Sequence, residues 1–300
     1  MTHRKAVAVM IAVTLMWSIA GVVSRHLEAA RSFEVTFWRS LFNGIALALM
    51  LGWMRGPSTL VATLRQGDRT LWLSGVCWAV MFTAFMVALT LTSVANVLVT
   101  MAIAPLFTAL TARVALGHRL ALRTWVAIFV AGAGIVWMYA REVGGGDGNA
   151  VLGTAVALGV PVAAAINWTI IQHNRGSAQQ DMLPAVLIGA LISAAVTLPL
   201  SLPLAASIHD IALLALLGTV QLAIPCLIAV TVARVLSAPE MSLLGLLEVI
   251  FGVAWAWLGA GESPSIHVLG GGALVLGALA VNEWLALRPG PASTRALGRG

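Results

Sequence analysis

The stretch that decides the fold runs from Leu236 to Glu262, LSAPEMSLLGLLEVIFGVAWAWLGAGE. It is apolar over the roughly 20 residues that an α-helix needs to cross a bilayer, and it carries one carboxylate, Glu248, near its middle. A second stretch on the same plan runs from Ser93 to Arg119, SVANVLVTMAIAPLFTALTARVALGHR. Both begin with a short polar step and reach a Leu-Gly pair before a turn. Two such stretches about half a chain apart indicate a membrane protein built by duplication.

The composition of the whole chain supports this interpretation. Of its 300 residues, 60% are apolar and only 9% are charged, which leaves too few polar side chains to cover a folded surface in water. The two cysteines, Cys77 and Cys226, lie in apolar runs, so no disulfide and no metal site are expected. The net charge of +6 is spread over loop ends, which predicts a role in membrane topology and no nucleic-acid partner. The pattern predicts an all-α polytopic membrane protein.

Hydropathy predicts ten membrane-spanning helices, and a glycine-rich segment divides them into two groups of five. An odd number of spans reverses the direction of the second group, so we expect two inverted five-helix repeats (5+5). The first repeat covers residues 1–143, a linker covers 144–149, the second repeat covers 150–288, and residues 289–300 form a disordered cytoplasmic tail. The spans are 6–24, 34–53, 71–90, 93–114, 122–140, 150–172, 183–201, 210–233, 238–258 and 266–287.

Basic residues predict the orientation. With the N-terminus in the cytoplasm, most arginines and both N-terminal cations, Arg4 and Lys5, lie on the cytoplasmic side, and only Arg25, Arg31 and Arg141 lie outside. We therefore expect a multi-pass protein of the plasma membrane, the inner membrane of a bacterium, with both termini in the cytoplasm.

Enzyme motifs are missing from the sequence. There is no His-Glu-x-x-His, no phosphate-binding loop ending in Gly-Lys-Ser/Thr and no Gly-x-Ser-x-Gly. We expect no catalytic residue, no cofactor and no metal. Polar residues within the spans are more informative, because a charged side chain at the centre of a bilayer costs about 2.5–3.5 kcal/mol on insertion scales.

Glu248 and Arg39 are the two charged residues placed deepest in spans. Glu248 shares a small and polar stripe with Ser242, Gly245 and Gly252. It either hydrogen-bonds a neighbouring helix, or binds a substrate amine or couples transport to protons. Arg39 either pairs with Glu34 or Glu28, or snorkels to the interface, or binds a substrate carboxylate.

Three tryptophans lie deeper than the interfacial ones, and an amphipathic ring suits a cavity that accepts apolar and aromatic substrates. Trp17 lies toward the outer end of its span and Trp168 toward the inner end of its own. An inverted repeat makes them counterparts near opposite gates. The predicted substrate-binding residues are Trp17, Arg39, Asn43, Trp78, Asn96, Thr100, Phe107, Trp168, Gln221, Met241 and Glu248.

Several blocks resemble the drug/metabolite transporter superfamily, in its ten-helix EamA type. In two respects the chain departs from the family pattern: His118-Arg119 stands where Gly-Glu is usual, and Val249 stands where proline commonly follows Glu248. The resemblance implies the 5+5 fold and transport of small molecules, and the tryptophan-rich spans are most similar to YddG-type exporters of aromatic amino acids. The blocks are Leu15-Met16-Trp17-Ser18 with Ser24-Arg25, Phe37-Trp38-Arg39, Ala104-Pro105-Leu106-Phe107, and Ser237-Ala238 to Gly261-Glu262.

These observations predict a secondary transporter that exports amino acids, with aromatic and hydrophobic ones favoured, or related small metabolites. Its partners are a small-molecule substrate, the lipid bilayer and, under the coupling hypothesis for Glu248, protons. It works by alternating access as a monomer or weak homodimer. An exporter of drugs or other amphipathic compounds is the alternative within transport, and a membrane-embedded enzyme or receptor module is the alternative from another class.

Overall fold

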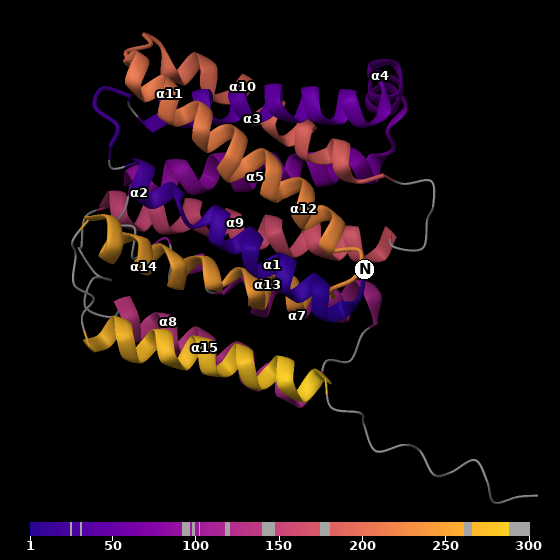
Figure 1. Ribbon diagram of the computed structural model, residues 1–300, viewed down its shortest axis with the longest axis vertical. Coiled ribbons are helices and arrows are strands. Elements are labelled where there is room, and N and C mark those ends of the chain that lie inside the picture. The colour runs from indigo at the N-terminus through magenta and orange to yellow at the C-terminus, as the bar shows by residue number, and fades with distance from the viewer. Residues whose placement is uncertain are drawn as a thin grey trace, which may run out of the picture.

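The computed structural model describes residues 1–24, 26–30, 32–91, 97, 100–101, 103–117, 121–139, 148–174, 181–260 and 266–287. Every regular element in these ranges is helical, and the long helices lie alongside one another (Figure 1). In chain order they are α1 (His3–Trp17), α2 (Ala20–Ser24), α3 (Ser32–Arg55), α4 (Pro57–Gln66), α5 (Arg69–Leu91), α7 (Ala104–Leu116), α8 (Leu122–Tyr139), α9 (Gly148–His173), α10 (Leu183–Ser201), α11 (Ile208–Leu216), the π-helix η2 (Leu217–Ala223), α12 (Ile224–Val232), α13 (Ala238–Gly245), α14 (Leu247–Ala260) and α15 (Ile266–Leu287).

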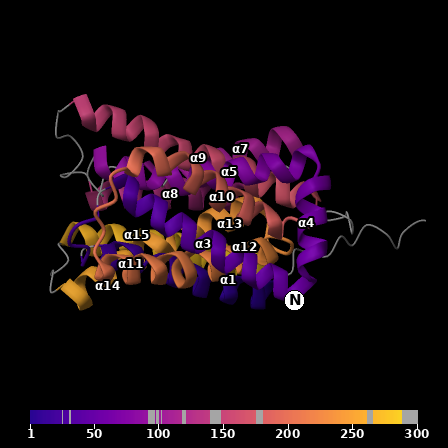
Figure 2. The same ribbon diagram turned by 90° about the horizontal axis from the view of Figure 1, so that it is seen from above.

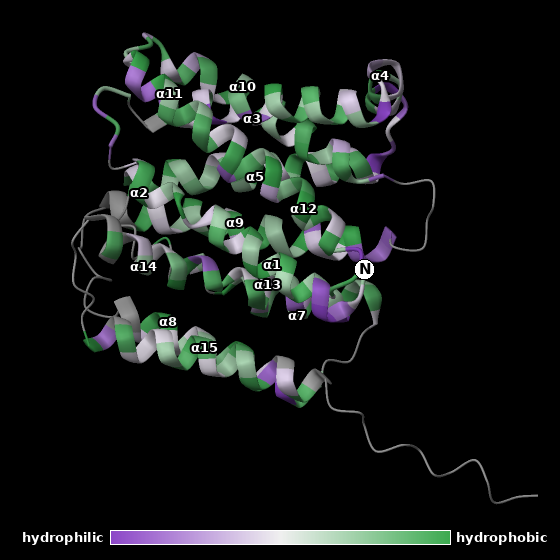
Figure 3. Ribbon diagram, viewed as in Figure 1, coloured by the Kyte–Doolittle hydropathy of each residue, from purple (hydrophilic) through white to green (hydrophobic). Residues whose placement is uncertain are grey.

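Six helical stretches in the described ranges are long and apolar enough to cross a membrane, which confirms the all-helical membrane class. Each falls on a predicted span, as do the shorter apolar helices at 104–116, 122–137 and 269–282. Hydrophobic residues cover the long helices, and hydrophilic residues gather at helix ends and turns (Figure 3). The full count of ten spans in a 5+5 arrangement stays a prediction. The six stretches are His3–Ser24, Phe33–Arg55, Arg69–Leu91, Val151–His173, Leu183–Ser201 and Ile208–Val232.

The predicted domain boundaries fall mostly outside the described residues. Within the linker predicted at 144–149, only Gly148 and Asn149 are described, and they already belong to α9. Residues 144–147 and the predicted tail at 289–300 lie outside the described ranges. The boundaries of the two repeats therefore stay a prediction.

Two of the predicted spans are interrupted near the middle of the bundle. Between α1 and α2 the chain turns at Ser18, whose hydroxyl donates to the carbonyl of Leu15 at 2.7 Å instead of to a neighbouring helix. Between α13 and α14 the N–H of Leu246 bonds the carbonyl of Leu243, three residues back, at 3.1 Å. Both interruptions leave carbonyl groups near the bundle centre that regular helix would have used.

A π-helical segment, η2, interrupts a third span, and proline explains its position. Pro225 has no N–H, so it cannot bond the carbonyl of Gln221 four residues earlier. The N–H of Ile224 bonds Thr219, five residues back, which is the π-helical register. Gly218 lets η2 press against α3, because a Cβ there would lie 2.6 Å from the carbonyl oxygen of Arg39.

The helix α10 is buried between α3 and α5, and glycine makes its contact with α5 close. A Cβ on Gly189 would lie 2.3 Å from the Cβ of Trp78 and 2.9 Å from the carbonyl oxygen of Gly75. A Cβ on Gly75 would in turn lie 2.5 Å from Ile188. Small residues at such crossings are the usual means of close helix packing in membranes.

We expect Gly189→Ala to destabilise the protein by about 1–3 kcal/mol, the usual cost of overpacking a core. The added methyl would have to displace the backbone of α5, since its nearest neighbours are backbone and Cβ atoms. Thermal unfolding in detergent measures the effect. The matched control is Gly277→Ala in α15, where a Cβ would meet nothing within 4 Å. Equal melting temperatures for the two variants would contradict this account of the packing.

Two carboxylates hold the end of the bundle that lies away from the N-terminus. Asp210 accepts hydrogen bonds from the N–H groups of Glu28, Ala29 and Ala30 at 2.8 to 2.9 Å. Glu34 accepts from the N–H groups of Ala205 and Ala206 at 2.8 to 3.0 Å. The predicted pairing of Glu34 with Arg39 is therefore wrong, because Glu34 closes the turn between α10 and α11.

Candidate substrate cavity

A cavity of about 160 Å³ lies among the middle turns of the helices. Its volume is close to the ~150 Å³ of an apolar cavity that accepts a benzene molecule. The wall is mostly apolar and aromatic, with a few polar groups, which is the usual composition of a small-molecule site. The lining residues are Met10, Trp17, Arg39, Trp78, Met81, Phe82, Phe85, Met101, Ala104, Val160, Pro161, Ala164, Trp168, Gln221, Leu222, Cys226, Met241, Ser242, Gly245, Leu246, Glu248 and Val249.

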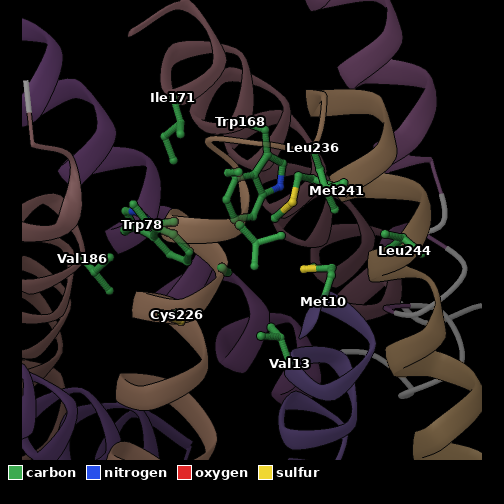
Figure 4. Close-up of a cluster of buried hydrophobic side chains, with 14 of the residues drawn as sticks. Met10, Val13, Trp78, Trp168, Ile171, Val186, Cys226, Leu236, Met241 and Leu244 are labelled. Carbon is green, nitrogen blue, oxygen red and sulfur yellow. The ribbon is translucent and has the colours of Figure 1, made fainter. Parts of the chain in front are cut away.

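Aromatic rings form one side of this cavity. The rings of Trp78 and Trp168 meet edge to face, with centroids 5.6 Å apart, and Phe82 lies 5.5 Å from Trp78. Figure 4 shows Trp78, Trp168, Met241 and Met10 gathered around one space, contributed by α5, α9, α13 and α1. Such a wall suits an aromatic or branched apolar group, because rings and thioethers adapt to it with little polar cost.

Arg39, on α3, brings a positive charge to the cavity wall. It is only 2% exposed, and its one hydrogen bond to a described residue is a long one, from Nη2 to the carbonyl of Phe82 at 3.5 Å. Its Nε has no partner in the described part of the chain. A buried guanidinium left so poorly paired is costly, so this geometry favours an anionic ligand.

Glu248 brings a negative charge to the same wall. It lies in the first turn of α14, directly after the interruption at Leu246, where a carboxylate interacts favourably with the helix dipole. It is partly accessible because it faces the cavity, and it interacts electrostatically with Arg39. No ion pair joins Glu248 and Arg39, and no described residue donates a hydrogen bond to the Glu248 carboxylate. The cavity therefore holds two opposite charges that are not bound to each other.

The interrupted helices supply further polar groups. Gln221, in η2, donates from Nε2 to the carbonyl of Trp17 at 3.0 Å, a carbonyl freed by the turn after α1. The Oε1 of Gln221 has no partner among the described residues. In the predicted stripe, Ser242 and Gly245 lie on the wall with Glu248, and Ser242 contacts the hydroxyl of Thr108 at 2.6 Å.

The structure brings most of the predicted site residues to this cavity. Trp17, Arg39, Trp78, Trp168, Gln221, Met241 and Glu248 all lie on its wall. Asn43 is completely buried one turn from Arg39, away from the wall, and neither atom of its amide has a partner in the described ranges. Thr100 and Phe107 are also placed away from the wall, and Asn96 lies outside the described residues.

Sequence reasoning missed several lining residues, most of them apolar. Met10, Met81, Phe82 and Met101 had no feature to separate them from ordinary packing residues. Cys226 was predicted to behave as a small hydrophobe, and it lines the cavity next to the π-helix. The one signal for that position was Pro225, because proline inside a span marks an irregular helix.

Comparison with known proteins agrees with this arrangement. The sequence profile of the EamA-like transporter family matches residues 4–140. Residues 4–140 form an EamA-like transporter domain. Members of this family are membrane transporters of the drug/metabolite transporter superfamily, not enzymes, so the chain is a multi-pass membrane protein of a transporter family.

The EamA-like domain holds one part of the cavity wall. Trp17, Arg39 and Trp78 lie within it, whereas Trp168, Gln221 and Glu248 lie beyond the matched residues. No curated protein matches the sequence. Among solved structures, 28 chains match. One, described as the crystal structure of a protein, superposes with a TM-score of 0.76 at 19% identity, over 95% of this chain and 98% of that chain. At this identity the likeness shows the fold alone.

Proposed function

We propose that this protein is a secondary transporter that exports amino acids, aromatic and hydrophobic ones above all, across the plasma membrane. The observation that carries the proposal is the pair of separate, opposite charges, Arg39 and Glu248, on one apolar and aromatic wall. A zwitterion satisfies both charges at once: its carboxylate binds Arg39 and its ammonium binds Glu248. Its side chain then lies against Trp78 and Trp168.

Desolvation makes this arrangement selective. A ligand with a single charge leaves the opposite charge of the cavity buried and unpaired, which costs several kcal/mol in a site shielded from water. An uncharged ligand leaves both charges in that state. The net neutral cavity therefore favours zwitterions over simple amines and simple acids.

Helix pairing supports the proposed 5+5 architecture, with repeats at 1–143 and 150–288. If α9 corresponds to α1, α10 to α3, α12 to α5 and α13 to α7, then each contact between helices has a counterpart. The pair α5 and α9 matches the pair α12 and α1, and α10 with α5 matches η2 with α3. The pairs α3–α10, α7–α13 and α8–α15 join each helix to its own counterpart. A two-fold relation between inverted halves produces this pattern.

Polar contacts at the N-terminal end support alternating access from a conformation closed at that end. Gln172 accepts from the N–H of Ala238 at 2.6 Å, which joins α9 to α13. His3 contacts Glu240 at 3.2 Å, which joins α1 to α13. Between these contacts and the cavity lie the buried side chains of Met241 and Trp168. Opening toward the cytoplasm then requires these contacts to break, with Trp17 and Trp168 nearest the two opposite mouths.

An exporter of drugs or other amphipathic compounds is the second candidate, and the methionines favour it. Met10, Met81, Met101 and Met241 all line the cavity, and methionine-rich walls adapt to ligands of different shape. This candidate differs in its use of charge, since it accepts amphipathic cations without a carboxylate.

Counterflow in liposomes tests the two candidates. Purified protein is reconstituted in vesicles preloaded with phenylalanine, and exchange is measured with labelled phenylalanine, phenethylamine and 3-phenylpropionate, which share the ring and differ in charge. We expect phenylalanine to exchange at least tenfold faster than either single-charge compound, with protein-free vesicles as the blank. Faster exchange of phenethylamine would support the amphipathic exporter instead. Lack of exchange with all three, by protein that unfolds cooperatively on heating, would contradict transport of aromatic amino acids.

A further inference from the structure

The short helix α4 lies across the ends of the other helices, at the same end of the bundle as the N-terminus. Figure 1 shows it end-on beside helices seen from the side, and Figure 2, turned by 90°, shows it upright at the end of the bundle. Gly56 makes this turn with φ +83° and ψ 141°, a conformation that only glycine adopts readily. Pro57 then begins α4 at its first turn. The Gly-Pro pair thus sets α4 parallel to the plane of the membrane.

The two faces of α4 differ. Leu60 is buried and Leu64 packs against the core, one turn apart on the inner face. The outer face is exposed and combines apolar with polar and basic side chains. It forms a shallow hollow lined by Pro57, Ser58, Val61, Ala62, Arg65 and Gln66. A helix of this kind lies at the interface of a membrane, with its apolar groups at the level of the glycerol backbone.

The charges around α4 favour an anionic partner. Arg55 and Arg234, at the same end of the bundle, are both bound to Asp181. Arg65 makes no ion pair with any residue that the structure describes, and Asp68, in the turn after α4, accepts a hydrogen bond from the N–H of Leu71. The guanidinium of Arg65 is therefore available to a phosphate.

Two exposed tryptophans place α4 at the level of lipid headgroups. Trp53, near the end of α3, is 90% exposed, and Trp72, in the first turn of α5, is 45% exposed. The indole nitrogen of Trp72 lies beside the α4–α5 turn, 3.6 Å from where a Cβ on Gly67 would be. Tryptophan is enriched at the boundary between the hydrocarbon core and the headgroups. The hollow on α4 is thus continuous with the lipid-facing surface of α3 and α5.

We propose that the outer face of α4 binds the headgroup of an anionic phospholipid from the adjacent leaflet. The phosphate pairs with Arg65, and the glycerol and upper acyl carbons lie against Pro57, Val61 and Ala62. By the positive-inside rule this leaflet is the cytoplasmic one, which carries the anionic lipids in many membranes. The site does not depend on what the cavity transports.

Native mass spectrometry of the purified protein tests the proposal, with dioleoyl-phosphatidylglycerol and dioleoyl-phosphatidylcholine as probes. We expect phosphatidylglycerol to bind more tightly than phosphatidylcholine, and Arg65→Gln to weaken its binding about fivefold, the effect of one cation near an anionic surface. Arg113→Gln is the matched control, an exposed arginine in the last turn of α7. Gly56→Ala, which keeps Arg65 but strains the turn, is also expected to weaken binding.

Three outcomes would overturn the proposal. One is unchanged phosphatidylglycerol binding in Arg65→Gln. Another is an equal loss in Arg113→Gln, which would mean that general charge decides binding. The third is competition by inorganic phosphate at the concentration of the lipid, which would make α4 a site for free anions. Persistence of lipid binding in phosphate, together with selective loss in Arg65→Gln, supports the lipid site.

Discussion

Arg39→Gln is expected to reduce kcat/KM for phenylalanine exchange by about 30-fold or more, the effect of losing about 2 kcal/mol from a buried charge pair. The variant is also expected to reverse the preference of the cavity. With Arg39 gone, Glu248 is the remaining charged side chain on the described wall, so phenethylamine should exchange better than phenylalanine. The protein should still fold, because the single described hydrogen bond of Arg39 is long and its Nε is unpartnered.

Lysine at the same position separates charge from geometry. Arg39→Lys keeps the positive charge but loses the planar pair of donors that matches a carboxylate, so partial recovery of phenylalanine exchange is expected. Arg113→Gln, an exposed arginine far from the cavity wall, is the control for loss of a positive charge. Wild-type exchange of phenylalanine by Arg39→Gln would show that Arg39 does not contact the substrate. An equal loss for phenylalanine and phenethylamine would point to damaged folding, which thermal unfolding checks.

The sequence predicted the helices well because their physical cause is local. A continuous apolar run of about 20 residues has few alternatives to a membrane helix, so the position of α10 agrees with the predicted span 183–201. Arg39 and Glu248 were singled out for a similar reason, since a charge within such a run is costly and needs a compensating environment. That both lie on one cavity could not be deduced, because it depends on how α3 and α14 pack.

The errors of prediction arose where a distant partner decides. Glu34 and Arg39 are five residues apart, which places them on different faces of α3, whereas Trp38 is four residues from Glu34 and donates to it at 3.3 Å. The remaining bonds of Glu34 go to residues some 170 positions later, which no local pattern reveals. Helix α4 was missed because a ten-residue helix in a loop has no hydropathy signal of a span, although Gly56-Pro57 marks the turn that orients it.

Glu248→Gln is expected to produce the opposite change in selectivity to Arg39→Gln. Glutamine keeps the shape of the side chain but carries no negative charge, so the ammonium of phenylalanine loses its partner and kcat/KM should fall by about 30-fold or more. The free positive charge of Arg39 should then favour 3-phenylpropionate over phenylalanine. Glu248→Asp keeps the charge on a shorter side chain and is expected to recover part of the phenylalanine exchange. An unchanged order of the three substrates in Glu248→Gln would remove Glu248 from the substrate site.

The same variant tests whether Glu248 couples export to protons. The alternative of an interhelical hydrogen bond finds no donor among the described residues, which leaves the amine site and the proton site as the roles to separate. A coupling role predicts that wild-type vesicles accumulate phenylalanine when a pH gradient is imposed, and that Glu248→Gln loses this accumulation while residual exchange without a gradient continues. If wild-type accumulation does not respond to the gradient, Glu248 acts only on the substrate's ammonium. In that case the direction of transport follows from the substrate gradient alone, because a carrier moves its ligand down whichever gradient binds to both of its states.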